Sequence, residues 1–172
     1  MTEPRLTHVD ETGAARMVDV SAKPVTAREA TAAGRVLVTP EVLALLRGGG
    51  VPKGDAVAVA RIAGIAGAKR TPDLVPLCHP IALHGVTVDV TVADDAVEIV
   101  ATARTADRTG VEMEALTSVA VAGLTMIDMV KAVDPRASIT DVRLLAKSGG
   151  KSGDWTRSGP QDERAAGRDQ LR

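Results

Sequence analysis

An alternating pattern in the middle of the chain places the strongest constraint on its fold. From Val86 to Val92 every second residue is a valine, and the residues between the valines are polar. This is the period of a β-strand with one buried face. After the turn-forming pair Asp94-Asp95 the alternation resumes and continues to Arg104. Residues 85–104 are therefore predicted to form a β-hairpin, against which the rest of the chain must pack.

Helix signals lie on both sides of this hairpin. Thr39-Pro40-Glu41 is a typical helix start, and Asp134-Pro135 is a typical helix end. Helices are expected over residues 40–48, 55–69 and about 110–133, and further strands over 28–38 and 139–147. The resulting order predicts an α+β fold of the ferredoxin-like (split βαβ) type, an antiparallel sheet with helices packed on one face.

Length and composition predict one domain and one tail. A chain of 172 residues that is 45% hydrophobic can bury one core. We assign residues 1–155 to this domain. Residues 156–172 are polar and charged without periodicity, so we expect a disordered tail. The chain contains neither Phe nor Tyr, so aliphatic side chains must fill the core.

Charge and cysteine content exclude several classes of protein. The 21 basic and 22 acidic side chains nearly balance, and no aromatic platform for bases is present, which excludes a nucleic-acid binder. A single cysteine, Cys78, excludes a disulfide and fits a reducing compartment. No segment is expected to approach the roughly 18 to 20 apolar residues of a membrane span. We therefore expect a cytoplasmic protein that binds neither nucleic acid nor membrane.

Two charged residues interrupt the otherwise apolar second half of the long helix. Asp128 and Lys131 are spaced to share one helix face. They fit either an ordinary ion pair on a solvent face or a buried pair. Because burying both charges costs several kcal/mol each, such a pair is retained where it serves function. The apolar surroundings favour the buried, functional pair.

Polar residues at helix ends give further candidates. Lys53 precedes a helix whose positive end it would oppose, so an anionic ligand would explain its position. Glu112 and Glu114 begin the long helix, and the helix dipole accounts for one of them. Their spacing sends the two carboxylates to different faces.

Two loops carry residues with more than one interpretation. Cys78-His79 suggests a metal ligand or a nucleophile pair, but also a small buried thiol beside a packed loop histidine. We expect no metal centre, because no second cysteine exists. The loop from Ser148 to Gly153 resembles a phosphate cradle, although Leu145 replaces the first glycine of a P-loop. Lys147 and Lys151 fit either phosphate contacts or solvated linker charges.

Several ordered motifs together resemble the MoaC family, the cyclic pyranopterin monophosphate synthases. The likeness runs from Leu6 to about Asp154. The motifs are Lys53-Gly54-Asp55, Ala60-Arg61-Ile62-Ala63-Gly64-Ile65, Lys69-Arg70-Thr71-Pro72-Asp73-Leu74, Pro76-Leu77-Cys78-His79-Pro80, Thr109-Gly110-Val111-Glu112-Met113-Glu114-Ala115-Leu116-Thr117 and Leu144-Leu145-Ala146-Lys147-Ser148-Gly149-Gly150-Lys151-Ser152-Gly153.

The resemblance implies a lyase of molybdenum cofactor biosynthesis. It implies conversion of 3′,8-cyclo-7,8-dihydro-GTP into cyclic pyranopterin monophosphate, with release of pyrophosphate. It also implies a ferredoxin-like homohexamer, a trimer of dimers whose active sites are shared between two subunits. No cofactor is required, because lysines can neutralise the phosphates, although Mg²⁺ bound to the triphosphate is compatible with the reaction.

The resemblance also assigns roles to residues. Asp128, Lys131 and Lys53 fall on catalytic positions. Substrate contacts fall on Leu77, Cys78, His79, Glu112, Met113 and Glu114, and phosphate contacts on Lys69, Lys147 and Lys151. We hypothesise that Asp128 and Lys131 move protons while Lys53, Lys147 and His79 stabilise phosphate charge.

The helix geometry supports a site built from two subunits. Glu114 and Asp128 are separated by about 21 Å along one helix at roughly 1.5 Å per residue, too far to touch one reacting centre. A dimer with antiparallel helices brings Glu114 of one chain near Asp128 of the other.

Two rival functions remain: a ferredoxin-like module that binds a nucleotide and regulates a partner, and a generic phosphate-transfer enzyme. Pyrophosphate release distinguishes them from the synthase.

Overall fold

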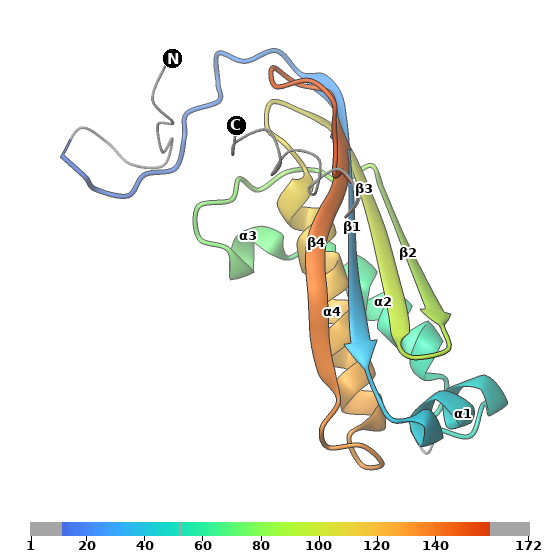
Figure 1. Ribbon diagram of the computed structural model, residues 1–172. Coiled ribbons are helices and arrows are strands. Elements are labelled where there is room, and N and C mark those ends of the chain that lie inside the picture. The colour runs from blue at the N-terminus through green and yellow to red at the C-terminus, as the bar shows by residue number, and fades with distance from the viewer. Residues whose placement is uncertain (1–11, 52, 159–172) are drawn as a thin grey trace, which may run out of the picture.

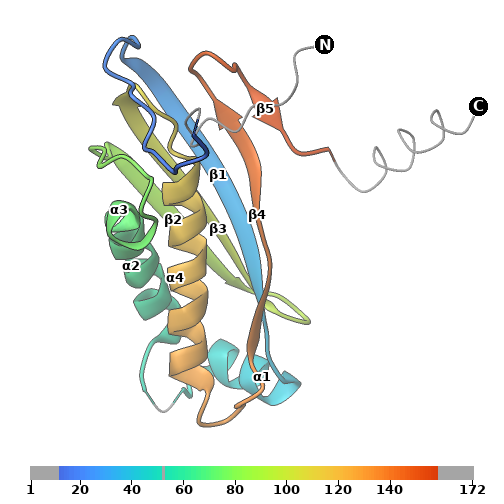
Figure 2. The same ribbon diagram turned by 90° about the vertical axis from the view of Figure 1, so that its left-hand side faces the viewer.

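Five antiparallel strands form the sheet in the part of the chain that the structure describes. The computed structural model describes residues 12–51 and 53–158. The strands are β1 (Thr26–Leu37), β2 (Gly85–Val92), β3 (Val97–Asp107), β4 (Ser138–Ser148) and β5 (Trp155–Thr156). Their order across the sheet is β2-β3-β1-β4-β5, and every neighbouring pair is antiparallel (Figure 1 and, for β5, Figure 2). The predicted α+β antiparallel fold is confirmed, and its arrangement is consistent with the ferredoxin-like type.

The predicted hairpin is present. β2 and β3 pair in register from Gly85 opposite Arg104 to Val92 opposite Val97. The Ala93 backbone N–H donates to the Ala96 carbonyl across the turn at 2.9 Å. Valines of β2 and the alternate residues of β3 point to the same side of the sheet, where helices cover them.

Helices cover one face of the sheet. They are α1 (Pro40–Gly48), α2 (Ala56–Ala68), α3 (Thr71–Leu74) and α4 (Glu112–Val130). Figure 2 shows α2 and α4 side by side on that face, with α1 at one end of the sheet. Three of these helices were predicted, but α3 was not. Thr71-Pro72-Asp73, which follows the end of α2, begins a further helical turn because proline fits the start of a helix.

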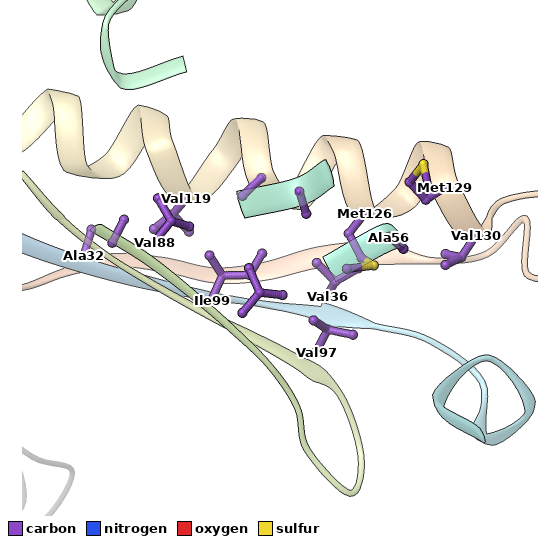
Figure 3. Close-up of a cluster of buried hydrophobic side chains, with 14 of the residues drawn as sticks. Ala32, Val36, Ala56, Val88, Val97, Ile99, Val119, Met126, Met129 and Val130 are labelled. Atoms are coloured by element: carbon purple, nitrogen blue, oxygen red, sulfur yellow. The ribbon is translucent and has the colours of Figure 1, made fainter. Parts of the chain in front are cut away.

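Small residues allow α2 and α4 to pack closely. A Cβ added at Gly67 would lie 2.7 Å from the Val121 side chain, and one at Gly34 of β1 would lie 2.7 Å from Val119. Between the helices and the sheet lie fully buried aliphatic side chains such as Ile99 and Met126 (Figure 3). Close backbone approach thus offsets the lack of large aromatic residues in this core.

The apolar composition of α4 reflects its central position. By length and hydropathy, α4 would suffice to cross a membrane, contrary to the expectation that no segment approaches such a span. However, 56% of this stretch is buried inside the fold, against the sheet and α2. Its apolarity is therefore explained by packing in the core.

The predicted C-terminal tail begins in an ordered strand. Thr156, the predicted start of a disordered tail, lies in β5 and pairs with Ala146 of β4. The Arg157 backbone N–H donates to the Leu145 carbonyl at 2.7 Å. Residues 159–172 of the predicted tail lie outside the described residues, as does the part of the family resemblance from 6 to 11.

A buried aspartate links the start of α1 to the loop that follows α4. Asp134 is only 4% exposed, and its carboxylate accepts hydrogen bonds from the Thr39 and Arg136 backbone N–H groups at 2.9 and 3.0 Å. Asp134→Ala leaves both donors unpaired, so we expect the free energy of unfolding to fall by about 2 kcal/mol. Urea denaturation measures this. The exposed Asp89→Ala is the control and should shift stability by less than about 0.5 kcal/mol.

Candidate functional site

A cavity of about 530 Å³ lies at the N-terminal end of α4. It is lined by all six predicted substrate contacts, which come from the loop after α3 and from the first turn of α4: Leu77, Cys78, His79, Glu112, Met113 and Glu114. The structure therefore brings together residues that are more than thirty positions apart in the sequence. No signal in the local sequence pattern predicts that these residues line one cavity.

The two glutamates of this cavity differ in environment. Glu114 is buried at 3% exposure, whereas the Glu112 carboxylate accepts a hydrogen bond from Lys147 Nζ at 3.0 Å. Burial raises the pKa of Glu114 to about 7, and the charge of Glu112 adds to this effect, while the Glu114 backbone amide opposes it. Glu114 can therefore hold or release a proton near neutral pH.

The raised pKa of Glu114 predicts a pH-dependent stability. Its ordinary pKa is 4.5, so between pH 4.5 and 7 the folded protein keeps a proton that the unfolded chain releases. The free energy of unfolding should fall as the pH rises through this window. Glu114→Gln remains neutral, so the variant should match the parent near pH 4.5 and exceed it by about 3 kcal/mol at pH 8. Urea denaturation at both pH values tests this. A difference in unfolding free energy between variant and parent that is the same at pH 4.5 and pH 8 would contradict it.

Cys78 and His79 do not form a nucleophile pair in this structure. Burial, with a smaller effect of the Glu114 charge, raises the pKa of the Cys78 thiol, which disfavours the reactive thiolate. His79 Nε2 donates instead to the backbone carbonyl of Val18 at 2.7 Å. In residues 12–51 and 53–158, no group of three or more His, Cys, Asp or Glu side chains is placed to hold a metal ion.

A smaller polar cavity of about 110 Å³ adjoins the first and shares Gly110 and Glu112 with it. Lys147 lines it, and Lys147 Nζ also lies 3.3 Å from Ser152 Oγ. Arg28, which the sequence did not single out, lies here too. Gly149 is tightly fitted, because a Cβ there would lie 2.2 Å from the Ala27 carbonyl and its φ is +84°.

Two predicted phosphate contacts lie elsewhere. Lys69 is exposed at the C-terminal cap of α2, and Lys151 is exposed in the turn before β5. Neither lysine is among the described residues that line these two cavities. Their predicted roles gain no support from the geometry of the single chain.

The remaining candidates gather at the opposite end of α4. Asp128 Oδ1 lies 2.7 Å from Lys131 Nζ, and Asp128 Oδ2 lies 3.0 Å from Lys53 Nζ. Lys53 Nζ also donates to the Asp128 carbonyl at 2.8 Å. Lys53 therefore has a protein partner at the C-terminal end of α4, and no bound anion is needed to explain its position.

The expectation that Asp128 and Lys131 form a buried pair is wrong for this chain. Their side chains are 55% and 58% exposed. The reason is that they lie on the face of α4 that points away from the sheet. Hydrogen bonds and charge from Lys131 and Lys53 lower the pKa of Asp128 to about 2, so the group is a carboxylate at neutral pH.

Exposed apolar side chains lie on the helical layer. Met113 and Leu124 of α4 are 39% and 60% exposed, and Ile62 of α2 is 67% exposed. At about 100° per residue, Met113, Leu124, Asp128 and Lys131 share one face of α4. We call Met113, Leu124 and Ile62 the apolar helix surface. Exposed apolar side chains bordered by charges are consistent with an interface.

Comparison with known proteins identifies close relatives. The model of the MoaC family matches residues 17–150. A cyclic pyranopterin monophosphate synthase of Streptomyces coelicolor is 74% identical over 156 residues, which cover 91% of this chain and 92% of the relative. Cyclic pyranopterin monophosphate synthase 2 of Mycobacterium tuberculosis is 60% identical over 88% and 91%. The synthase of Parvibaculum lavamentivorans is 57% identical over 90% and 98%.

Proposed function

The chain belongs to the MoaC family, and we propose that it is a cyclic pyranopterin monophosphate synthase of molybdenum cofactor biosynthesis. Its substrate in this proposal is 3′,8-cyclo-7,8-dihydro-GTP, and pyrophosphate leaves as the cyclic phosphate closes, which makes the enzyme a lyase. The identity of 74% to a synthase over nine-tenths of both chains is the observation that carries the proposal.

The cavity at the N-terminal end of α4 supports this function. Its size suits a small nucleotide-derived ligand, and its walls combine apolar side chains with the buried carboxyl of Glu114. The adjoining polar cavity carries the guanidinium of Arg28 and the ammonium of Lys147. We assign the ring system to the larger cavity and part of the phosphate charge to the smaller, where cations offset it.

The cluster at the other end of α4 supplies the remaining chemistry. Asp128 is ionised at neutral pH, so it can accept a proton but has none to give in the free protein. Lys53 and Lys131 are the proton donors that contact it. In our proposal Asp128 and Lys131 exchange protons with the reacting ring, and Lys53 orients Asp128 and stabilises developing negative charge.

A second copy of the chain is proposed to unite the two ends. α4 is one continuous helix, so Glu114 and Asp128 of one chain stay about 21 Å apart at 1.5 Å per residue. A two-fold axis near the middle of α4 would place Glu114 of one protomer beside Asp128 of its partner and cover the apolar helix surface. We propose a homohexamer, a trimer of such dimers, as the resemblance implies. Covering this face would also bury the Asp128 cluster.

The proposal requires no resident cofactor. Lysine and arginine side chains of the described cavities supply positive charge for the phosphates. Mg²⁺ bound to the triphosphate of the substrate is compatible with this arrangement. The balance of charges and the single cysteine favour a cytoplasmic protein that acts on a small molecule and binds neither nucleic acid nor membrane.

Pyrophosphate release tests the proposed function. The purified full chain, incubated with 3′,8-cyclo-7,8-dihydro-GTP, should release one pyrophosphate for each cyclic pyranopterin monophosphate formed. GTP in place of the cyclised nucleotide should yield no pyrophosphate. A regulator would bind the nucleotide unchanged, and a generic phosphate-transfer enzyme would also act on GTP. Either result would contradict the proposal.

A further inference from the structure

The segment that precedes β1 forms part of the larger cavity without being a helix or a strand of the sheet. Val18, Val20 and Lys23 line this cavity together with the residues of the α3 loop and of α4. We call residues 18–23 the wall segment. Its residues are mostly exposed, so little apolar burial holds it in place. Figure 2 shows this blue stretch beside the green loop that carries His79.

Two side chains from other elements hold the ends of the wall segment. His79 Nε2 lies 2.7 Å from the Val18 carbonyl oxygen, and Arg108 Nε donates to the Lys23 carbonyl at 3.0 Å. Each bond joins positions at least 61 residues apart. Both acceptors are backbone atoms, so the bonds fix the path of the main chain.

The hydrogen bond of His79 to Val18 shows which ring nitrogen carries a hydrogen atom. A carbonyl oxygen can only accept a hydrogen bond, so His79 Nε2 must carry the hydrogen. That N–H is occupied by Val18 and is not available to a phosphate oxygen while the wall segment is in place. This differs from the expectation that His79 stabilises phosphate charge.

Lys23 gives the wall segment a function. It lines the cavity, and it forms no salt bridge with a carboxylate in the part of the chain that the structure describes. A lysine without an acidic partner at the edge of a cavity can neutralise an anionic ligand at little cost.

We propose that His79 and Arg108 are positioning residues, which hold the wall segment against the cavity and thereby place Lys23 as an additional cation for the anionic substrate. This role rests on the proposed function, which supplies the anionic substrate. The placement of the wall segment itself is a property of the free protein and is measured without substrate.

A pair of His79 variants separates positioning from catalysis. The amide nitrogen of glutamine matches histidine Nε2 and donates a hydrogen bond, but it neither titrates nor carries charge. His79→Gln should keep kcat/KM within about threefold of the parent, whereas His79→Ala should lose about tenfold, the effect of one hydrogen bond. Backbone amides of the wall segment should exchange hydrogen faster in His79→Ala and at the parental rate in His79→Gln.

A double-mutant cycle tests the link from Arg108 to Lys23. Lys23→Ala and Arg108→Ala should each raise KM several-fold with kcat nearly unchanged, and the double variant should resemble Lys23→Ala alone. The exposed Arg136→Ala is the control and should leave KM unchanged. Fully additive effects of Lys23→Ala and Arg108→Ala would overturn the proposed link.

Two further results would overturn the proposal. One is a His79→Gln variant as impaired as His79→Ala with normal hydrogen exchange, which would show that the imidazole itself acts on the substrate. The other is unchanged exchange of the wall segment in His79→Ala. If the parent releases no pyrophosphate, the proposed function fails, while hydrogen exchange still decides whether His79 holds the wall segment.

Discussion

Asp128→Asn is expected to reduce turnover by about 10²- to 10⁴-fold, the range typical of losing a positioned acid–base group. Asparagine has the same size but cannot accept a proton. It also removes the negative charge that Lys53 and Lys131 contact at 3.0 and 2.7 Å. Because the side chain is 55% exposed in the single chain, its replacement should leave the fold of the protomer intact.

A second aspartate offers a matched control for Asp128→Asn. Asp73 also forms an i,i+3 ion pair, with Arg70 at 3.3 Å, and its side chain is 64% exposed. Asp73→Asn should therefore keep turnover near that of the parent. Initial rates of pyrophosphate release, with the oligomeric state of each variant checked by light scattering, provide the measurement. Turnover by Asp128→Asn within a few-fold of the parent would exclude the proposed role.

The two ends of α4 have opposite electrostatic character, which suggests how they divide the chemistry. Burial raises the pKa of Glu114 to about 7, so this carboxyl is partly protonated at neutral pH. Two lysines lower the pKa of Asp128 to about 2, so this carboxyl is ionised. An acid and a base with well-separated pKa values are what a proton-transfer site needs. A site that contained both would have a proton donor and an acceptor at the same pH.

The sequence predicted the sheet and the large helices because their patterns are local. The valine alternation of β2 continues over a whole strand, and the Thr39-Pro40-Glu41 signal lies at the observed start of α1. β5 was missed because a strand of two residues has no period. The pairing of β5 with β4 is set by tertiary contacts.

The candidate site was predicted less completely, because burial and long-range contacts are not local properties. Glu112 and Glu114 were expected on different faces, but the pattern did not show that Glu114 would be the buried one. The exposed position of Asp128 was mispredicted because apolar neighbours along α4 do not reveal which face another element covers. The contact of His79 with Val18 spans 61 residues, and no sequence period reports it.

Each active site is proposed to combine Glu114 of one protomer with Asp128 of its partner. A shared site of this kind predicts how mixed oligomers behave. A Glu114→Gln chain and an Asp128→Asn chain should each be inactive when purified alone. In a dimer that contains one of each, both lesions fall in one site, and the other site is entirely wild type. Activity should therefore return, up to about half of the parental value per mixed dimer.

Co-expression of the two chains with different affinity tags, followed by purification through both tags, provides these mixed oligomers. Hydrogen exchange or circular dichroism of each parent variant controls for folding. Because this measurement depends only on which chain supplies each residue, it tests the shared site without any assumption about proton order. Recovery of pyrophosphate release to between roughly a tenth and a half of the parental rate is the predicted result. Mixed oligomers of confirmed composition that remain as inactive as either folded parent would contradict the shared site.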